Sequence, residues 1–229
     1  MCPRTYSFIL IAVLFTAPFS SLAGTGHHSA HDQEEHLTEV QAKPIGGIYP
    51  LSVDPLGDSL VEVEKPFIIL HNGRELRFAT EANIEAFQAD PDKYLVQIDQ
   101  LLILQQSPLY PMDTCIVSDQ ALGAMGEPVD YLYGNRLIRF CCKMCTGQFH
   151  KDPDKYLAKI DAAVIEAQIA DYPTATCVVS GDTFGGDMGE PIDYVLGNRL
   201  VRLCCKMCID AFEANPAAYL VNLEGDEEQ

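Results

Sequence analysis

Residues 133–145 read YGNRLIRFCCKMC, and residues 196–208 read LGNRLVRLCCKMC. Each stretch joins a glycine-led turn signal to a β-rich run, and it ends in three cysteines within five positions. Agreement this close between two segments of one chain indicates an internal duplication. We therefore expect one local structure, and one chemistry, to occur twice.

The duplication extends well beyond these stretches. The segment 110–160 aligns with 172–223, with one residue inserted near Gly185. A third, weaker copy comes first, because HNGRELRF at 71–78 matches YGNRLIRF and FQADPDKYLVQID at 87–99 matches FHKDPDKYLAKID. We number the copies repeat 1 (49–109), repeat 2 (110–171) and repeat 3 (172–229, with an acidic tail). In repeat 1, the positions of Cys115, Cys141, Cys142 and Cys145 are held by Asp54, Ala79, Thr80 and Asn83.

The patterning predicts an α+β fold of three tandem small modules, each a β-hairpin followed by helices. Gly134-Asn135 between two β-rich runs suits a two-residue type II′ turn, and Asn72-Gly73 suits a type I′ turn. A first helix is expected from about residue 142 to residue 149. Pro153 can open a second helix at its first position, running to about Ile169, and we expect that helix to dock on the next module.

The N-terminal residues read as a secretory signal. Arg4 precedes the apolar run 8–15, and Ser21-Leu22-Ala23 fits the small-x-small cleavage rule, which gives a signal peptide at 1–23. The apolar run is shorter than the roughly 18 residues that span a bilayer. The sequence thus predicts a secreted or periplasmic protein without a membrane span after signal cleavage. Residues 24–48 are polar and are expected to form a disordered leader that carries four histidines, His27, His28, His31 and His36.

The formal net charge is −18. Such an acidic chain repels phosphate backbones, so nucleic acid is excluded as an expected partner. The sequence contains no Ser-His-Asp set, Gly-rich phosphate loop or nucleophile elbow, and we expect a protein that is not an enzyme. A protein partner stays open.

The cysteines carry the functional signal. Eight of the nine remain after the predicted cleavage, four in each of repeats 2 and 3. Four sulfurs from two distant segments can build a closed tetrahedral shell, and a module of about 60 residues has a core thin enough to need a metal. Thiolates serve zinc and Cu(I) alike. The expected cofactor is a metal ion, zinc or copper, and the expected ligands are Cys115, Cys141, Cys142, Cys145, Cys177, Cys204, Cys205 and Cys208.

Two other roles for the cysteines stay open at this point. An even number of cysteines in an exported protein is typical of disulfides, so the alternative is a disulfide-stapled interaction module without metal. A Cys-x-x-Cys pair at a helix start also fits thiol–disulfide exchange, although no thioredoxin-like βαβ pattern surrounds it.

The cysteine spacing resembles a known family. A lone Cys, a gap of some 25 residues and then Cys-x3-Cys is similar to the TRASH domain, and GNRLIRFCCKMCTGQFHKDPDKYL also resembles the YHS domain. The resemblance implies a treble-clef-like fold, a link to heavy-metal sensing, trafficking and resistance, and metal ligation. The ligands that it implies are Cys115, Cys141 and Cys145 with Cys177, Cys204 and Cys208. Two features depart from the family: Cys142 and Cys205 are additional, and Ser118 and Ser180 stand where a treble clef often has a second Cys.

Repeat 1 lacks cysteines, so the sequence predicts two bound ions per chain. Its stability is expected to come from apolar burial of Phe67, Ile68 and Ile69 and of the run LLIL at 101–104. The methionines Met125, Met144, Met188 and Met207 recur at matching positions and are expected to fill gaps in the small cores. The alternative is that their thioethers are soft ligands, which suit Cu(I). Asp130 and Asp193 are expected to belong to the framework.

Overall fold

The computed structural model describes residues 43–185 and 189–224. The predicted signal peptide, residues 24–42 of the predicted leader, and Met188 lie outside the described residues. Residues 43–48, the last part of the predicted leader, are described, and the N–H of Ile45 donates to the carbonyl of Gly73 at 2.8 Å. These six residues therefore belong with the folded chain and contact the first hairpin.

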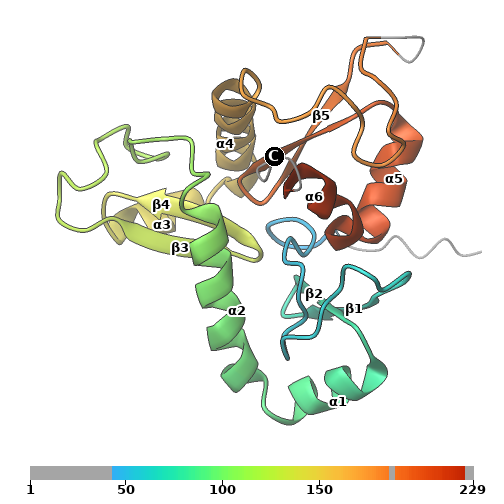
Figure 1. Cartoon of the computed structure of the whole chain (residues 1–229). Coiled ribbons are helices and arrows are strands. Elements are labelled where there is room, and N and C mark those ends of the chain that lie inside the picture. The colour runs from blue at the N-terminus through green and yellow to red at the C-terminus, as the bar shows by residue number, and fades with distance from the viewer. Residues whose placement is uncertain (1–42, 186–188, 225–229) are drawn as a thin grey trace, which may run out of the picture. The chain divides into compact units, whose positions relative to one another are not determined.

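Three antiparallel two-stranded hairpins, each followed by two helices, make up the described chain (Figure 1). One hairpin–helix unit corresponds to each repeat, which confirms the predicted mixture of α and β structure and the order of elements. Repeat 1 contains β1 (Phe67–His71), β2 (Arg74–Phe78), α1 (Glu81–Ala89) and α2 (Pro91–Gln106). Repeat 2 contains β3 (Val129–Tyr133), β4 (Arg136–Phe140), α3 (Met144–Phe149) and α4 (Pro153–Gln168). Repeat 3 contains β5 (Ile192–Leu196), β6 (Arg199–Leu203), α5 (Lys206–Ala214) and α6 (Pro216–Glu224).

The turns of the hairpins follow from their sequences. Asn72 and Gly73 both have positive φ, 52° and 80°, as a type I′ turn requires. In the other two hairpins only the first turn residue does, with 58° at Gly134 and 59° at Gly197, as in a type II′ turn. Both predicted turn types are confirmed, and each turn sets the register of the strands that it joins.

The helices start where proline and the capping residues place them. Pro153 is the first residue of α4, and the side chain of Asp152 accepts a hydrogen bond from the N–H of Lys155. The first helix of repeat 2, α3, begins at Met144 rather than at the predicted residue 142. In repeat 3 the equivalent of residue 142 is Cys205, whose backbone is extended with φ −159° and which precedes the helix. No helix among the described residues is long and apolar enough to cross a membrane.

Each repeat has an apolar cluster that includes a buried phenylalanine at one equivalent position: Phe87, Phe149 or Phe212. The clusters are not closed units. Leu200 of repeat 3 lies in the cluster of repeat 2, and Ala217 of repeat 3 lies in that of repeat 1. Because each core uses side chains of another repeat, the repeats stabilise one another, as neighbours in a repeat array do.

A polar junction joins repeat 1 to repeat 2. The side-chain amide of Asn135 donates to the carbonyl of Glu75 at 2.9 Å and accepts from Nε of Arg74 at 2.9 Å. Gln106, at the end of α2, donates to the carbonyl of Asn135 at 2.8 Å and accepts from the N–H of Leu137 at 2.9 Å. The second helix of repeat 1 thus docks on the hairpin of repeat 2, as predicted.

The same junction joins repeat 2 to repeat 3. Asn198 takes the place of Asn135, because its side chain donates to the carbonyl of Leu137 and accepts from Nε of Arg136. Gln168, at the end of α4, donates to the carbonyl of Asn198 and accepts from the N–H of Leu200. Gln106 makes the equivalent two hydrogen bonds to the hairpin of repeat 2. The repeated Gly-Asn-Arg stretch is therefore also an interface motif.

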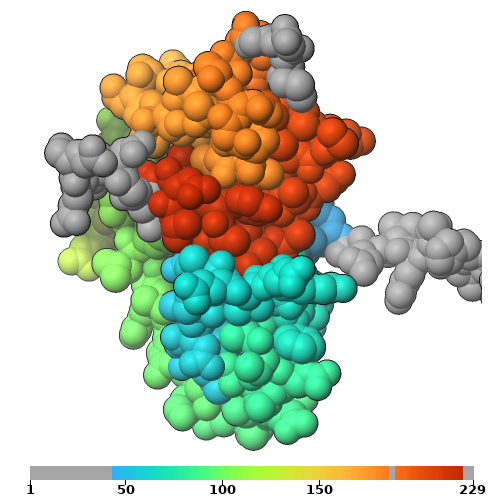
Figure 2. Space-filling view, turned by 45° about the vertical axis from the view of Figure 1, so that its right-hand side comes forward, coloured from blue at the N-terminus to red at the C-terminus, as the bar shows by residue number. Residues whose placement is uncertain are grey.

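Arg77 connects repeat 1 to repeat 3. Its side chain is 1% exposed, and its Nε lies 2.7 Å from a carboxylate oxygen of Glu75. Its two other nitrogens donate to the carbonyls of Glu213 and Ala214, at 2.7 and 2.8 Å. These carbonyls end α5, where a cation is favoured by the helix dipole. Figure 2 shows the cyan surface of repeat 1 directly against the red surface of the C-terminal helices.

Candidate metal centres

Cys115 is held in a tight loop ahead of the hairpin of repeat 2. Its N–H donates to the carbonyl of Gln120 at 2.7 Å, and its carbonyl accepts from the N–H of Asp119 at 2.9 Å. Asp119 has a φ of 56°, which lets the loop turn back on itself. Cys177 is held in the same way by Gly181 and Asp182. The loop buries the thiol completely.

Three buried thiols meet in repeat 2. Cys141 directly follows β4, and Cys145 lies in the first turn of α3. The sulfurs of Cys115, Cys141 and Cys145 all lie within 4.8 Å of one another, and those of Cys141 and Cys145 are 3.7 Å apart. We call these three residues the buried trio of repeat 2. The hairpin brings together residues that the sequence separates.

Repeat 3 has an equivalent buried trio, Cys177, Cys204 and Cys208. Its sulfurs also lie within 4.8 Å of one another, and those of Cys204 and Cys208 are 3.5 Å apart. Zinc–sulfur bonds of about 2.3 Å in a tetrahedron place sulfurs roughly 3.8 Å apart. Both trios therefore have separations close to those of a metal–thiolate shell.

A fourth thiol lies beside each trio, but Cys142 and Cys205 are not among the sulfurs that all lie within 4.8 Å of one another. Cys142 is 3.8 Å from Cys145, and Cys205 is 3.6 Å from Cys208, in both cases sulfur to sulfur. Both fourth thiols are partly exposed, whereas the trios are buried. Each cluster thus has three inner donors and one donor that solvent can reach.

The environment shifts the acidity of the inner thiols in opposite directions. Burial raises the pKa of Cys115. Hydrogen bonds from the Ser118 hydroxyl and from the N–H groups of Cys141 and Val117 together lower the pKa by more than burial raises it, so that it lies at about 6. Burial, with hydrogen bonds to Cys115 and Cys141, raises the pKa of Cys145 to about 12. The trio therefore combines Cys115, whose thiol loses its proton easily, with Cys145, whose thiol holds its proton and is hydrogen-bonded to the other two. A metal ion would displace these protons on binding.

Repeat 3 repeats these shifts. Burial raises the pKa of Cys177, but hydrogen bonds from the N–H groups of Ser180 and Cys204 outweigh burial, and the pKa lies at about 7. Burial, followed by hydrogen bonds to Cys204 and Cys205, raises the pKa of Cys208. The two clusters agree in electrostatics as well as in geometry.

A serine hydroxyl lies next to each cluster. Ser118 Oγ is 3.3 Å from the sulfur of Cys141, and Ser180 Oγ is 3.3 Å from that of Cys204. The sequence marked these serines only as departures from a family pattern. Their recurrence at one position was the available signal for a hydrogen-bond partner that orients a ligand.

All eight cysteines of the described residues are unpaired. The shortest sulfur–sulfur separation given above is 3.5 Å, against about 2.05 Å in a disulfide. The arrangement therefore has the spacing of a shared ligand shell, and no disulfide joins residues of the described chain.

In repeat 1 a carboxylate occupies the position of Cys115. Asp54 is 1% exposed. One of its oxygens accepts from the N–H groups of Leu56 and Asp58, at 2.8 and 3.0 Å. The other accepts from the N–H of Ala79 at 3.2 Å and from the amide of Asn83 at 2.6 Å. Four donors use the roughly four acceptor sites of a carboxylate, so this group is occupied without a metal.

Two expectations about apolar residues are wrong, the first only in part. Phe67 and Ile68 are 41% and 50% exposed and do not stabilise repeat 1 by burial. Ile69, however, packs against the core of repeat 1, and Leu102 of the run 101–104 is fully buried in it, as predicted. Met125, Met144 and Met207 are 64%, 81% and 75% exposed, so they fill no core gap. Phe67 and Ile68 lie on a strand of a two-stranded sheet, Met144 and Met207 lie at helix starts, and Met125 lies in the loop before β3. These positions put the side chains outward, where the sequence pattern alone suggested an interior.

The repeated acids have a framework role. Asp130 pairs with Arg139 across β3 and β4 at 2.7 Å, and Asp193 pairs with Arg202 across β5 and β6 at 2.8 Å. Neither acid belongs to a cysteine cluster. Both pairs hold adjacent strands together near the hairpin ends that carry Cys141 and Cys204.

No family model matches this chain, and no curated protein and no solved structure matches it either. The TRASH and YHS resemblance therefore stays a prediction. The geometry of the cysteine clusters has to carry the argument for function.

Proposed function

We propose that the chain is an exported protein that binds two thiophilic metal ions, zinc or copper, one at each cysteine cluster, for metal handling, storage or structural stabilisation. One observation carries the proposal: the same buried trio occurs twice with its three sulfurs within 4.8 Å of one another, and a fourth thiol lies 3.6–3.8 Å from the last cysteine of each trio. Thiolates are the ligands that zinc and Cu(I) share. The export signal predicted at residues 1–23 and the TRASH-like spacing agree with this proposal from the sequence.

The residues present suit such an ion. In repeat 2 the buried trio would hold it, Cys142 would complete a four-sulfur shell, and Ser118 would hydrogen-bond to Cys141. A bound ion would join the loop of Cys115 to the start of α3, in addition to the apolar packing of Ile116 in the same cluster as Phe149. In a small repeat whose core is shared, this link would add folding free energy directly.

The test combines three measurements on the mature chain, purified without reductant. Native mass spectrometry is expected to show two tightly bound ions, elemental analysis to identify them, and thiol titration after denaturation to find every cysteine reduced. A protein without metal and without free thiols would establish the disulfide-stapled module instead. Three tight ions would contradict the assignment of repeat 1.

A pair of variants tests the ligand set. Cys145 lies within 3.8 Å of both Cys141 and Cys142, so it belongs to every ligand combination in repeat 2. Structural zinc sites bind with about 10–16 kcal/mol, so one ligand of four is worth roughly 3 kcal/mol, or about 100-fold in affinity. We expect Cys145→Ser to lose about this much at one site and Cys142→Ser to lose less. Equal or reversed losses in a chelator competition assay would contradict the assignment.

A further inference from the structure

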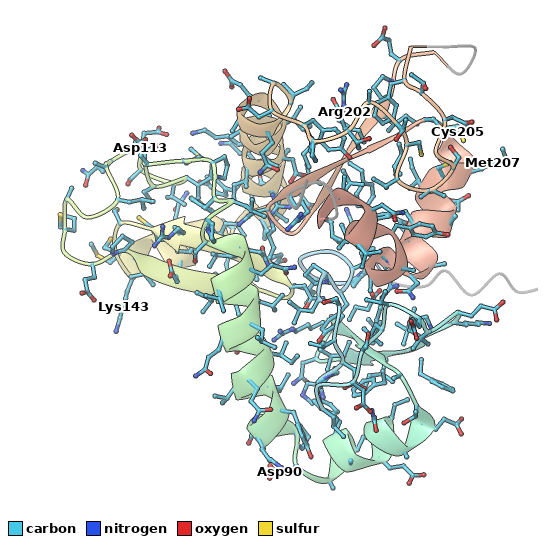
Figure 3. The ribbon with its side chains drawn as sticks, in the orientation of Figure 1. Asp90, Asp113, Lys143, Arg202, Cys205 and Met207 are labelled. Atoms are coloured by element: carbon cyan, nitrogen blue, oxygen red, sulfur yellow. The ribbon has the colours of Figure 1, made fainter. Side chains whose placement is uncertain are left out.

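Each cysteine cluster has an exposed methionine beside it. Met144 and Met207 occupy the same position in repeats 2 and 3, between the fourth thiol and the last cysteine of the trio. Both are among the most exposed large apolar side chains of the described residues. Figure 3 labels Met207 and Cys205 next to each other at the start of α5. The sulfur of Cys205 lies 3.6 Å from that of the buried Cys208, whereas Met207 is 75% exposed.

The stretch 141–145 begins and ends with a buried cysteine, and the three residues between are partly or fully exposed. Cys141 and Cys145 are buried, Cys142 is partly exposed, and Lys143 and Met144 are exposed. Repeat 3 has the same order from Cys204 to Cys208. Each cluster therefore presents to solvent one thiol and one thioether, two residues apart, above three inner thiols. We call Cys142 with Met144, and Cys205 with Met207, the outer pairs.

A single exposed methionine would need no explanation, because exposed apolar side chains are common. These two differ from that case in recurring at one position next to a partly exposed cysteine. They also contribute little packing, so the property that distinguishes methionine from leucine here is its soft sulfur. Thioethers suit Cu(I), whereas zinc takes thiolate, imidazole and carboxylate ligands.

We propose that the outer pairs are the sites at which Cu(I), delivered as a thiolate complex, is first bound before it passes to the buried trio. This inference rests on the proposed metal-binding function and deepens it, because it selects copper and assigns a route. Met144 and Met207 hold the arriving ion, and Cys142 and Cys205 transfer it inward.

The transfer is a ligand exchange without redox change. The thioether sulfur of Met144 bonds to the Cu(I) of the incoming complex, and the sulfur of Cys142 then displaces one donor thiolate. One Cu–S bond breaks as another forms, and the proton of the Cys142 thiol goes to the departing thiolate. Copper stays Cu(I) throughout, so the step needs no oxidant or reductant. The buried thiols then replace the remaining donor and the thioether.

The experiment uses the whole mature chain and Cu(I) bound to glutathione as the probe. Stopped-flow absorbance of the copper–thiolate bands measures the rate of uptake by the wild type and by the double variant Met144→Leu, Met207→Leu. Leucine preserves size and apolarity at exposed positions, so folding is unaffected. We expect the second-order rate constant for uptake to fall about tenfold in the double variant, because its transition state lacks the weak contact between Cu(I) and the thioether sulfur. The final copper stoichiometry is expected to stay at two.

Two controls separate this effect from others. Met125→Leu removes an exposed thioether that lies outside both outer pairs, and it is expected to leave the rate unchanged. Uptake of Zn(II) from a chelator is expected to be the same for the wild type and the double variant, because zinc does not use the thioether.

The outcomes distinguish the two proposals. Wild-type rates in the double variant, with two Cu(I) bound at equilibrium, would overturn the outer-pair route and leave the proposed function standing. A slower rate for zinc as well would also overturn it, because the effect would then not depend on soft sulfur. A wild type that takes up neither metal would overturn both.

Discussion

Asp54 in repeat 1 and Cys115 in repeat 2 occupy equivalent loops, and each joins its loop to the segment that follows the second strand. Asp54 does so with two of its four hydrogen bonds, which it accepts from Ala79 and Asn83. Cys115 does so with its sulfur near those of Cys141 and Cys145, the counterparts of Ala79 and Asn83. The comparison shows the same two segments brought together in two ways, by a carboxylate with four hydrogen bonds in repeat 1 and by three clustered thiols in repeat 2.

The hairpins differ in a second way. Arg139 forms a half-exposed pair with Asp130 across the strands of repeat 2. In repeat 1 the position of Asp130 is held by Ile68 and that of Leu137 by Glu75, and the equivalent Arg77 turns inward to Glu75. In repeat 2 the arginine forms a partly exposed ion pair between strands. With these two differences in repeat 1, the equivalent arginine is buried and binds the end of α5. Repeat 1, which has no cysteines, thus contacts repeat 3 through the side chain of Arg77.

Metal removal is expected to separate the repeats most strongly. A strong chelator with reductant should raise amide hydrogen exchange around Cys141–Phe149 and Cys204–Phe212 by on the order of 100-fold or more, because the metal contributes folding free energy there. The loop from Asp54 to Asp58 should change far less, since its cross-link consists of hydrogen bonds. Hydrogen exchange read by mass spectrometry measures both regions at once. An equal rise in the Asp54 loop would show that repeat 1 also depends on metal.

The two arginines provide a matched pair of variants. Arg77→Met should lower the free energy of unfolding by about 3–5 kcal/mol, because it leaves Glu75 and two helix-end carbonyls buried without their partner. Arg139→Met removes the equivalent side chain from an exposed pair and should cost less than about 1 kcal/mol. Urea unfolding of the metal-loaded protein compares them. Similar losses for the two variants would refute the assignment of Arg77 as the anchor.

The carboxylate of Asp54 is expected to have a somewhat smaller effect. Asp54→Ala leaves several N–H groups without an acceptor and should cost about 2–3 kcal/mol, while the number of bound ions stays at two. Asp54→Asn keeps one acceptor oxygen and serves as the milder control. Thermal unfolding together with metal analysis gives both readouts. A change in metal content would mean that Asp54 is a ligand after all.

The sequence by itself determined the local structure and the cysteine sets. The turn types follow from whether glycine or asparagine comes first, since positive φ is required at known turn positions. The start of α4 follows from Pro153, whose fixed φ suits the first helical position. The alignment of repeats paired Asp54 with Cys115 and Asn83 with Cys145, and the structure places these residues at equivalent centres. Such features depend on a few neighbouring residues or on an exact duplication.

The tertiary structure decided which side chains face inward. Met144 and Phe67 look like core residues in sequence but lie exposed, and Arg77 looks like a surface residue but is buried. The thiol of Cys142 is partly exposed although its neighbour Cys141 is buried. The burial of Arg77 depends on which repeat packs against which, because the carbonyls that it meets lie far along the chain in α5. Propensity and spacing describe one segment at a time, so they cannot specify contacts that form only when distant segments meet.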